Sequence, residues 1–303
     1  MTTRRRLLVI LVTALVSVSA TIFAQRVFEN EPAVAGATAV SMRSSVLDED
    51  REYFVHLPEA YRADSTTRYP VLYVLDGMYQ SGPTAESAAL LARIGVIPPM
   101  IIIGVPSMDA KRRNRDYTPP EMKLNTDAAT SPMGAADRFH SFLKTELITR
   151  IERDYRTARP RMLAGWSRGG LFVIYSELLD PSLFDARFAH SPALWREDDV
   201  IVTRLQRALQ ARSRPRGFLY LSLGSEENDN MTAAFKHAVA VLEATPSPAL
   251  AWRADFSAGG THDSNPRLST PVGLCAMFNV HADRSCRPDA TLGLYGHAKD
   301  SIQ

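Results

Sequence analysis

Apolar and polar residues follow two different patterns in the first third of this chain. Over 38–46 and 51–57 they alternate, which predicts two antiparallel strands with one buried face, joined by an acidic turn. The next apolar stretch, 71–75, has no polar interruption, as is typical of a strand buried on both faces. We therefore expect the alternating pair at one edge of a sheet whose centre is covered by helices.

Strand-like and helix-like segments alternate from there to residue 278. Strands are expected at 100–105, 161–164, 186–190, 218–223 and 252–256, and helices at 85–94, 134–155, 171–179, 198–211, 231–244 and 268–278. Such alternation predicts an α/β fold with a mostly parallel sheet and helices on both faces. The antiparallel pair would form its amino-terminal edge.

One long stretch, 106–133, interrupts this alternation and is expected to be irregular. It concentrates arginines beside an aromatic residue: Arg112, Arg113, Arg115 and Tyr117. Long loops in compact domains are often functional, and this one leaves the carboxyl end of a predicted strand, where ligands bind in open α/β sheets. Arg115 and Tyr117 are therefore candidate substrate-binding residues. A second interpretation of Arg115 stays open, in which it pairs with Asp116 and holds the loop in place.

The first residues have the regions of an export signal. Arg4, Arg5 and Arg6 precede an apolar run at 7–18, and small residues follow that run. We expect a signal peptide at 1–24, a tether at 25–36 and a single domain at 37–303. An uncleaved membrane anchor is the alternative. In both cases the domain would be exported, either to the periplasm or to the medium.

Composition narrows the class of protein and its partners. Of the 303 residues, 45% are hydrophobic and 22% are charged, as in a globular protein with one large core. The 35 basic and 33 acidic side chains give a net charge of +2, which does not favour nucleic acid or an anionic membrane surface as a partner. Cys275 and Cys286 are expected to form a disulfide in an oxidising compartment, with two buried thiols as the alternative.

Residues 165–169 spell Gly-Trp-Ser-Arg-Gly between a predicted strand and a predicted helix. G-x-S-x-G in that position is typical of a nucleophile elbow, a sharp turn that exposes a serine hydroxyl at the carboxyl end of the sheet. Glycine is needed on both sides because the turn crowds the neighbouring backbone. Ser167 is therefore the candidate nucleophile, and the adjacent Trp166 is a candidate substrate-binding residue. A turn with only a structural role is the alternative.

A serine hydroxyl needs a base that takes its proton, and histidine is the usual one because it titrates near neutral pH. The histidines that follow Ser167 are His190, His237, His262, His281 and His297. In this type of fold the chain order is serine, acid, histidine. His262 follows the last predicted strand in a glycine-containing loop that can reach the serine. We therefore assign His262 as the base.

The acid is expected on the loop after the preceding strand, which ends at Gly224. Three carboxylates lie there: Glu226, Glu227 and Asp229. The acid often comes three positions after the glycine, which favours Glu227, where a carboxylate would orient the imidazole and stabilise its cation. Each of the three also fits a solvated loop residue.

The transition state needs hydrogen-bond donors for the developing oxyanion. In this type of fold one is the backbone amide after the nucleophile, here that of Arg168. The second is expected from the turn after an earlier strand, where Gly77 would let the backbone approach the substrate and Met78 is the preferred donor. An ordinary turn at these residues is the alternative.

Six blocks of the chain resemble the esterase family of α/β-hydrolases that includes enterochelin and related siderophore esterases, S-formylglutathione hydrolase, feruloyl esterases and mycolyltransferases. The blocks are 51–58 (REYFVHLP), 69–77 (YPVLYVLDG), 115–119 (RDYTP), 165–170 (GWSRGG), 191–195 (SPALW) and the glycine loop ending at His262. Trp195, at the end of the fifth block, is a further candidate substrate-binding residue. The chain is most similar to exported single-domain members that resemble siderophore esterases.

The resemblance implies an α/β-hydrolase without a large lid, with a serine, acid and histidine apparatus and with no metal or other cofactor. Some similar members work with serine and histidine and no firm acid, which leaves the role of Glu227 open. The first hypothesis is hydrolysis of a small-molecule ester through an acyl-serine, with a siderophore-type or other polyfunctional ester as substrate. The alternatives are acyl transfer to an alcohol, and a non-catalytic binding protein on a hydrolase scaffold.

Overall fold

The computed structural model describes residues 36–122, 133–211 and 215–278. The predicted signal peptide and nearly all of the predicted tether lie outside these residues, as do His281, His297 and Cys286. The other cysteine, Cys275, is buried in the last described helix, and the predicted disulfide stays a prediction. Within the described residues, no helix combines the length and the apolar character that a membrane span requires.

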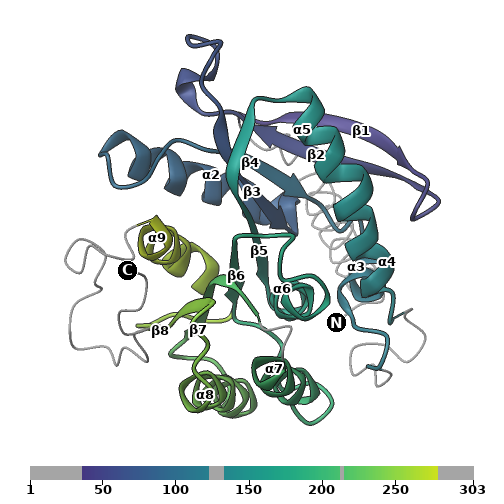
Figure 1. The fold of residues 1–303 in the computed structure, drawn as a ribbon, viewed down its shortest axis with the longest axis vertical. Helices are drawn as coiled ribbons and strands as arrows, with labels where there is room; N and C mark the ends of the chain where they lie inside the picture. The colour runs from purple at the N-terminus through teal and green to yellow at the C-terminus, as the bar shows by residue number, and fades with distance from the viewer. Residues whose placement is uncertain (1–35, 123–132, 212–214, 279–303) are drawn as a thin grey trace, which may run out of the picture. The chain divides into compact units, whose positions relative to one another are not determined.

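The described residues form an eight-stranded sheet with the order β1-β2-β4-β3-β5-β6-β7-β8 (Figure 1). Its strands are β1 (Thr38–Ser44), β2 (Glu49–His56), β3 (Tyr69–Leu75), β4 (Ile101–Val105), β5 (Thr157–Trp166), β6 (Ala186–His190), β7 (Gly217–Gly224) and β8 (Leu250–Ser257). β1 pairs antiparallel with β2, β2 pairs antiparallel with β4, and the remaining neighbours are parallel. The predicted α/β-hydrolase fold with an antiparallel amino-terminal edge is therefore confirmed.

Helices cover both faces of this sheet, as the strand pattern requires. They are η1 (Glu59–Tyr61), α2 (Gly77–Arg93), α3 (Ala110–Tyr117), α4 (Ala136–Phe142), η2 (Leu143–Leu147), α5 (Ile148–Asp154), α6 (Arg168–Leu179), α7 (Val200–Gln210), α8 (Asp229–Ala244) and α9 (Asn265–Phe278). One face carries α2 and α9, which contact each other, while α6, α7 and α8 pack in sequence on the other (Figure 1). Each face has its own cluster of buried apolar side chains.

The prediction that residues 106–133 are irregular is wrong in one respect, because these residues include the helix α3. Asp109 starts this helix by accepting a hydrogen bond from the Arg112 backbone amide at 2.8 Å. The helix is strongly polar, and ion pairs with residues outside it, including Glu49 at the start of β2, hold it in place together with the buried Tyr117 at its end. Residues 123–132 of the predicted loop lie outside the described part of the chain.

Parallel pairing places the carboxyl ends of β3 to β8 at one edge of the sheet. The segments that leave this edge are the start of α2 after β3, the region of α3 after β4, the start of α6 after β5, and the loops after β6, β7 and β8. These are the segments that carry the candidate residues. The fold therefore brings together side chains that are more than a hundred positions apart in the sequence.

Candidate active site

Ser167 occupies a sharp turn between the end of β5 and the start of α6. Its backbone has φ 57° and ψ −117°, a positive-φ conformation that is unusual for a residue with a side chain. The turn also demands close backbone contact, because a Cβ added at Gly165 would lie 2.4 Å from the Gly169 carbonyl oxygen. Any larger residue at Gly165 would push strand and helix apart. This is the geometry of a nucleophile elbow.

Hydrogen bonds from both sides fix the backbone of this turn. The Ser167 amide donates to the His190 carbonyl oxygen of β6 at 3.0 Å. The Ser167 carbonyl oxygen accepts from the amides of Leu171 in α6 and Ala193 beyond β6, each at 3.0 Å. The serine is therefore held to the neighbouring strand as well as to its own helix.

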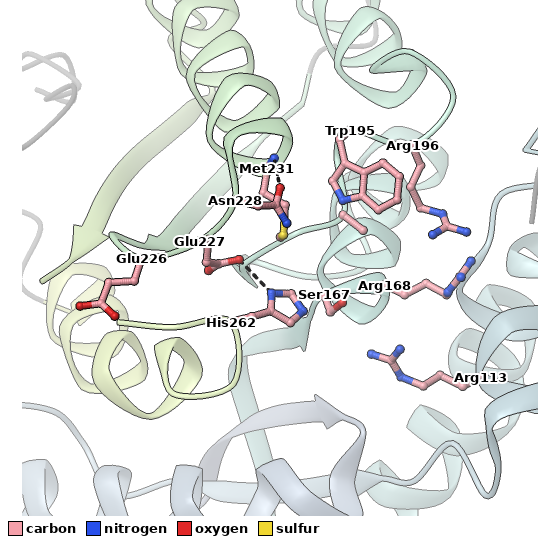
Figure 2. A pocket seen from close by; sticks show the side chains of 11 residues that line it. Arg113, Ser167, Arg168, Trp195, Arg196, Glu226, Glu227, Asn228, Met231 and His262 are labelled. Atoms are coloured by element: carbon pink, nitrogen blue, oxygen red, sulfur yellow. Dashed lines mark hydrogen bonds and ion pairs between the residues drawn. The ribbon is translucent and has the colours of Figure 1, made fainter. Parts of the chain in front are cut away.

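His262 lies on the loop between β8 and α9, and Glu227 lies on the loop between β7 and α8. The imidazole Nδ1 is 2.8 Å from Glu227 Oε2. The carboxylate side chain is fully buried, whereas the imidazole side chain is 35% exposed. Because Nδ1 contacts the carboxylate, Nε2 is the ring nitrogen left to face Ser167 (Figure 2). Ser167, Glu227 and His262 line the same pocket.

The structure separates the three acidic residues that the sequence left as alternatives. Glu226 is exposed at the pocket rim, and Asp229 is exposed in the first turn of α8. Glu227 is the member whose carboxylate contacts His262. Figure 2 shows Glu226 pointing away from the imidazole that Glu227 contacts.

Trp166 supports the histidine loop and does not line the pocket. Its indole Nε1 donates to the His262 carbonyl oxygen at 2.8 Å, and the two rings lie 5.0 Å apart. The structure thus gives Trp166 a supporting contact to the histidine loop, and its substrate-binding role stays a prediction. Trp195, the other predicted tryptophan, does line the pocket.

Arg168, whose backbone amide is a candidate oxyanion donor, begins α6 and lines the pocket. Gly77 and Met78 begin α2, where the first backbone amides have no partner within the helix. The two helix starts are neighbours, because a Cβ added at Gly169 would lie 3.3 Å from the Asp76 carboxylate. The Met78 side chain is 42% exposed, and neither residue is part of the pocket lining.

Gly77 meets a packing requirement that the sequence did not indicate. A Cβ at this position would lie 2.4 Å from the Val105 backbone nitrogen and 2.6 Å from the Gly104 Cα in β4. Glycine is thus needed for the approach of α2 to β4. The expected role of Gly77 in the approach of a substrate stays a prediction.

Arg113 is a pocket residue that sequence reasoning did not select. It projects from α3, and its Nε and Nη2 atoms each donate to one oxygen of Asp76 at 2.8 Å. Nη2 also donates to the Trp166 carbonyl oxygen at 3.2 Å. One guanidinium therefore joins α3, the turn before α2 and the strand end that precedes Ser167.

Arg115, the predicted substrate reader, is not part of the pocket lining. Its guanidinium donates to Glu49 Oε1 at 2.6 Å and to Asp116 Oδ1 at 2.7 Å. Although burial raises the pKa of Glu49, the hydrogen bond from Arg115 and the charge of Arg51 lower it to about 2. Of the two interpretations of Arg115, the structure supports the one in which it holds the segment in place.

Tyr117 is a core residue, which corrects its predicted role in substrate binding. The side chain is 1% exposed and packs against Phe139 and Phe172, with ring centroids 5.4 and 5.9 Å away. Its hydroxyl accepts a hydrogen bond from the Asp76 amide at 3.2 Å. Burial raises the pKa of Tyr117 well above its usual range, so the hydroxyl stays neutral.

The pocket has a volume of about 470 Å³ and a divided charge distribution. Arginines lie on one side of Ser167, and the carboxylates of Glu226 and Glu227 lie on the other (Figure 2). The arginines are Arg113, Arg168 and Arg196. Arg168 is fixed by a 2.8 Å hydrogen bond to Thr118 Oγ1, and Arg196 lies 5.3 Å from the centre of the Trp195 ring. A group that binds beside Ser167 on the arginine side would meet positive charge and a flat aromatic surface.

The sequence matches a known family over most of the described domain. The family model described as "Putative esterase" covers residues 44–264. The ferri-bacillibactin esterase BesA of Bacillus subtilis is 33% identical over 178 residues, which are 54% of this chain and 61% of that protein. The apo-salmochelin esterase of Escherichia coli is 27% identical over 206 residues, which are 65% of this chain and 63% of that protein. The chain therefore matches less than two thirds of the length of each.

A solved structure supports the same comparison at the level of the fold. The crystal structure of an IroE-like serine hydrolase from Shewanella oneidensis has a TM-score of 0.72 and 25% sequence identity, with 80% of each chain covered. The family match extends from the end of β1 to the loop that follows β8. It thus includes the turn with Ser167 and the loops that carry Glu227 and His262.

Proposed function

Since the chain belongs to the family described as "Putative esterase", we propose that it hydrolyses carboxylic esters through an acyl-serine intermediate on Ser167. One observation carries this proposal. A serine in an elbow and a histidine hydrogen-bonded to a buried carboxylate line the same pocket. Nucleophile, base and orienting acid are thus available in the chain order that α/β-hydrolases use.

In the proposed reaction, His262 Nε2 removes the Ser167 hydroxyl proton while Oγ attacks the ester carbonyl carbon. The backbone amides of Arg168 and Met78 donate to the negative carbonyl oxygen, and Glu227 stabilises the imidazolium. The imidazolium then gives its proton to the leaving oxygen, and the alcohol departs. A water molecule then attacks the acyl carbon and passes a proton to His262. The imidazolium returns this proton to Ser167 Oγ as the bond between Oγ and the acyl carbon breaks, which releases the carboxylic acid and regenerates free Ser167 and neutral His262.

We propose that the natural substrate is an anionic, polyfunctional ester of the siderophore type. Three arginines, of which Arg113 is paired with the Asp76 carboxylate, leave an excess of positive charge on one wall of the pocket, and this excess favours a negatively charged substrate. The Trp195 ring beside Arg196 adds a surface on which a planar group can stack. The names of the two relatives, esterases of ferri-bacillibactin and apo-salmochelin, point to the same class of substrate.

Two measurements on the wild type and Ser167→Ala test the activity. The first is turnover of p-nitrophenyl esters of increasing chain length, beside iron-free and ferric siderophore esters. The second is labelling by a fluorophosphonate probe. The variant should lose about 10⁴-fold or more in kcat and should not be labelled, with its folding unchanged. Labelling of the variant would remove Ser167 as the nucleophile.

The same assay separates the alternative functions. Product acyl groups found on an added alcohol, in place of free acid, would indicate an acyltransferase. A wild-type protein that binds these esters and turns none of them over would indicate a binding protein on a hydrolase scaffold.

We also propose that the protein is exported, on the basis of the basic and apolar pattern of residues 1–24. Labelling of cell fractions with the fluorophosphonate probe tests this proposal. In cells that produce the wild type, labelled protein should appear in the periplasmic or secreted fraction and be shorter than 303 residues. Full-length labelled protein confined to the cytoplasm would contradict it.

A further inference from the structure

The carboxylate of Glu227 is held on the side that faces away from His262. Its Oε1 atom accepts hydrogen bonds from the Ser191 hydroxyl at 2.5 Å and from the Gly224 amide at 2.8 Å. Oε2 is left for His262 Nδ1. Because the Glu227 side chain is fully buried and Ser191 is 0% exposed, water does not compete for these contacts. The position of the carboxylate therefore depends on the groups bound to Oε1.

Neighbouring side chains determine which way the Ser191 hydroxyl points. The Asn265 amide nitrogen donates to Ser191 Oγ at 2.8 Å, so Ser191 is an acceptor toward Asn265. The single hydroxyl hydrogen is then directed to the Glu227 carboxylate, which can only accept. Asn265 is itself oriented, because its oxygen accepts from the Ser257 hydroxyl at 2.6 Å.

A second serine confirms this orientation of the Asn265 amide. Asn265 Nδ2 also donates to Ser222 Oγ at 3.1 Å, and the Ser222 hydroxyl donates to Ser269 Oγ at 2.9 Å. Ser269 in turn donates to the Asn265 backbone carbonyl at 2.7 Å. Each of these hydroxyl and amide hydrogens has an acceptor. The hydrogen bonds that run from Asn265 through Ser191 end at the negatively charged Glu227 carboxylate.

We infer that Ser191 is a positioning residue for the proposed hydrolysis, which acts by holding the Glu227 carboxylate against His262. This inference rests on the proposed function. Ser191 directly follows β6. The last residue of this strand is His190, whose carbonyl oxygen accepts a hydrogen bond from the Ser167 amide. The backbone of Ser191 has φ 45° and donates to the Ser222 carbonyl oxygen of β7 at 2.7 Å. One short segment therefore fixes the nucleophile turn on one side and the acid on the other.

The experiment measures kcat, KM and the pH dependence of kcat/KM with a small p-nitrophenyl ester. Two variants remove the hydroxyl, Ser191→Ala and Ser191→Gly, and glycine accepts the left-handed backbone without strain. Both should lower kcat about ten-fold or more, the effect of one lost hydrogen bond to a charged group, with KM within about two-fold. The midpoint of the acid limb should move to lower pH, because a displaced carboxylate stabilises the imidazolium less.

Ser269→Ala is the matched control, because it removes an equally buried hydroxyl of the same cluster that makes no contact with Glu227. Its kcat should stay within about two-fold of the wild type. A double variant adds a second test: if Ser191 acts through Glu227, Ser191→Ala should add less than about two-fold to the loss caused by Glu227→Gln. Circular dichroism and thermal unfolding of each variant establish that the chain is folded.

The outcomes are distinct for the inference and for the proposed function. Wild-type kcat in both folded Ser191 variants would overturn the inference and leave ester hydrolysis standing. A midpoint of the acid limb that moves to higher pH, with kcat retained, would also overturn the inference. The Ser191 hydroxyl would then only weaken the negative charge of the Glu227 carboxylate and would not position it. If the wild type itself turns over no ester, or Ser167→Ala matches it, the proposed function fails.

Discussion

At the scale of single residues, the roles of similar side chains are decided by burial and by one or two contacts. Glu226 and Glu227 are adjacent and chemically identical, yet one is exposed at the pocket rim and the other is buried against His262. A carboxylate that is excluded from water and fixed by donors interacts more strongly with an imidazolium than one in solvent does. Only the buried carboxylate can therefore orient the base.

For the acid, Glu227→Gln should lower kcat by about 10²–10⁴-fold, because the amide no longer stabilises the imidazolium or enforces its tautomer. Asp229→Asn, at an exposed position in the first turn of α8, should keep the wild-type rate. Steady-state kinetics on one small neutral ester is sufficient to compare them. Equal and undiminished rates in both variants would mean that Ser167 and His262 work as a pair without an acid.

The sequence is enough to select Ser167 and His262 as candidates, because each is specified by local chain features, the elbow and the loop after the last strand. Glu227 could be narrowed only to one of three carboxylates, because the choice depends on which side chain is buried when the loop folds. Arg113 was missed for a related reason. The sequence pattern predicts a loop for this segment, whereas the phase of the helix α3 determines which of the three nearby arginines faces the pocket.

At the scale of elements, α3 illustrates how a segment with few apolar residues is kept in place. Glu49, the first residue of β2, pairs with Arg51, Arg112 and Arg115 at 2.7, 3.1 and 2.6 Å. The contacts with Arg112 and Arg115 join α3 to the antiparallel strands of the sheet. Sequence periodicity does not report such links, since the partners are about sixty positions apart. That is why the helix was predicted as irregular chain.

Arg115→Ala should therefore act on stability. Loss of its ion pairs with Glu49 and Asp116 should lower the free energy of unfolding by about 1–2 kcal/mol, with kcat and KM nearly unchanged for both neutral and anionic esters. Arg113→Ala, from the pocket side of the same helix, should raise KM for an anionic ester more than for a neutral one. Urea unfolding and kinetics with both esters check these expectations. A selective rise in KM for the anionic ester in Arg115→Ala would restore Arg115 as a binding residue.

At the scale of the whole molecule, the alternation of strands and helices in the sequence was enough to predict the class of sheet and its antiparallel edge. The order of the strands could not be obtained in this way, because β3 is hydrogen-bonded on one side to β4 and on the other to β5, and alternation alone does not specify neighbours. The site depends on that order, since Ser167 follows β5 and the acid and base follow β7 and β8. Local pattern thus predicted the elements and their edge, while long-range packing determined the pocket.

Buried histidines couple the stability of this fold to pH, and His190 is the clearest case. It lies in β6 with its Nδ1 2.7 Å from Ser269 Oγ, and burial lowers its pKa from 6.5 to about 3. The unfolded chain binds a proton at this histidine below about pH 6.5, while the folded chain does not until about pH 3. The stability that neutral His190 contributes is therefore full above pH 6.5 and is lost as the pH falls toward 3, by up to about 1.4 kcal/mol per pH unit.

His190→Gln tests this coupling, because glutamine keeps hydrogen-bonding groups in the serine cluster and does not titrate. The variant should be less stable than the wild type at pH 7, since its shape fits the site less well. Its free energy of unfolding should nevertheless fall less than that of the wild type between pH 7 and pH 5. Some pH dependence should remain, because burial also lowers the pKa of His140, to about 4, and that of His56. Urea unfolding at both pH values measures the difference, and equal losses in the two proteins would show that His190 takes up its proton in the folded state and contributes nothing to the acid sensitivity.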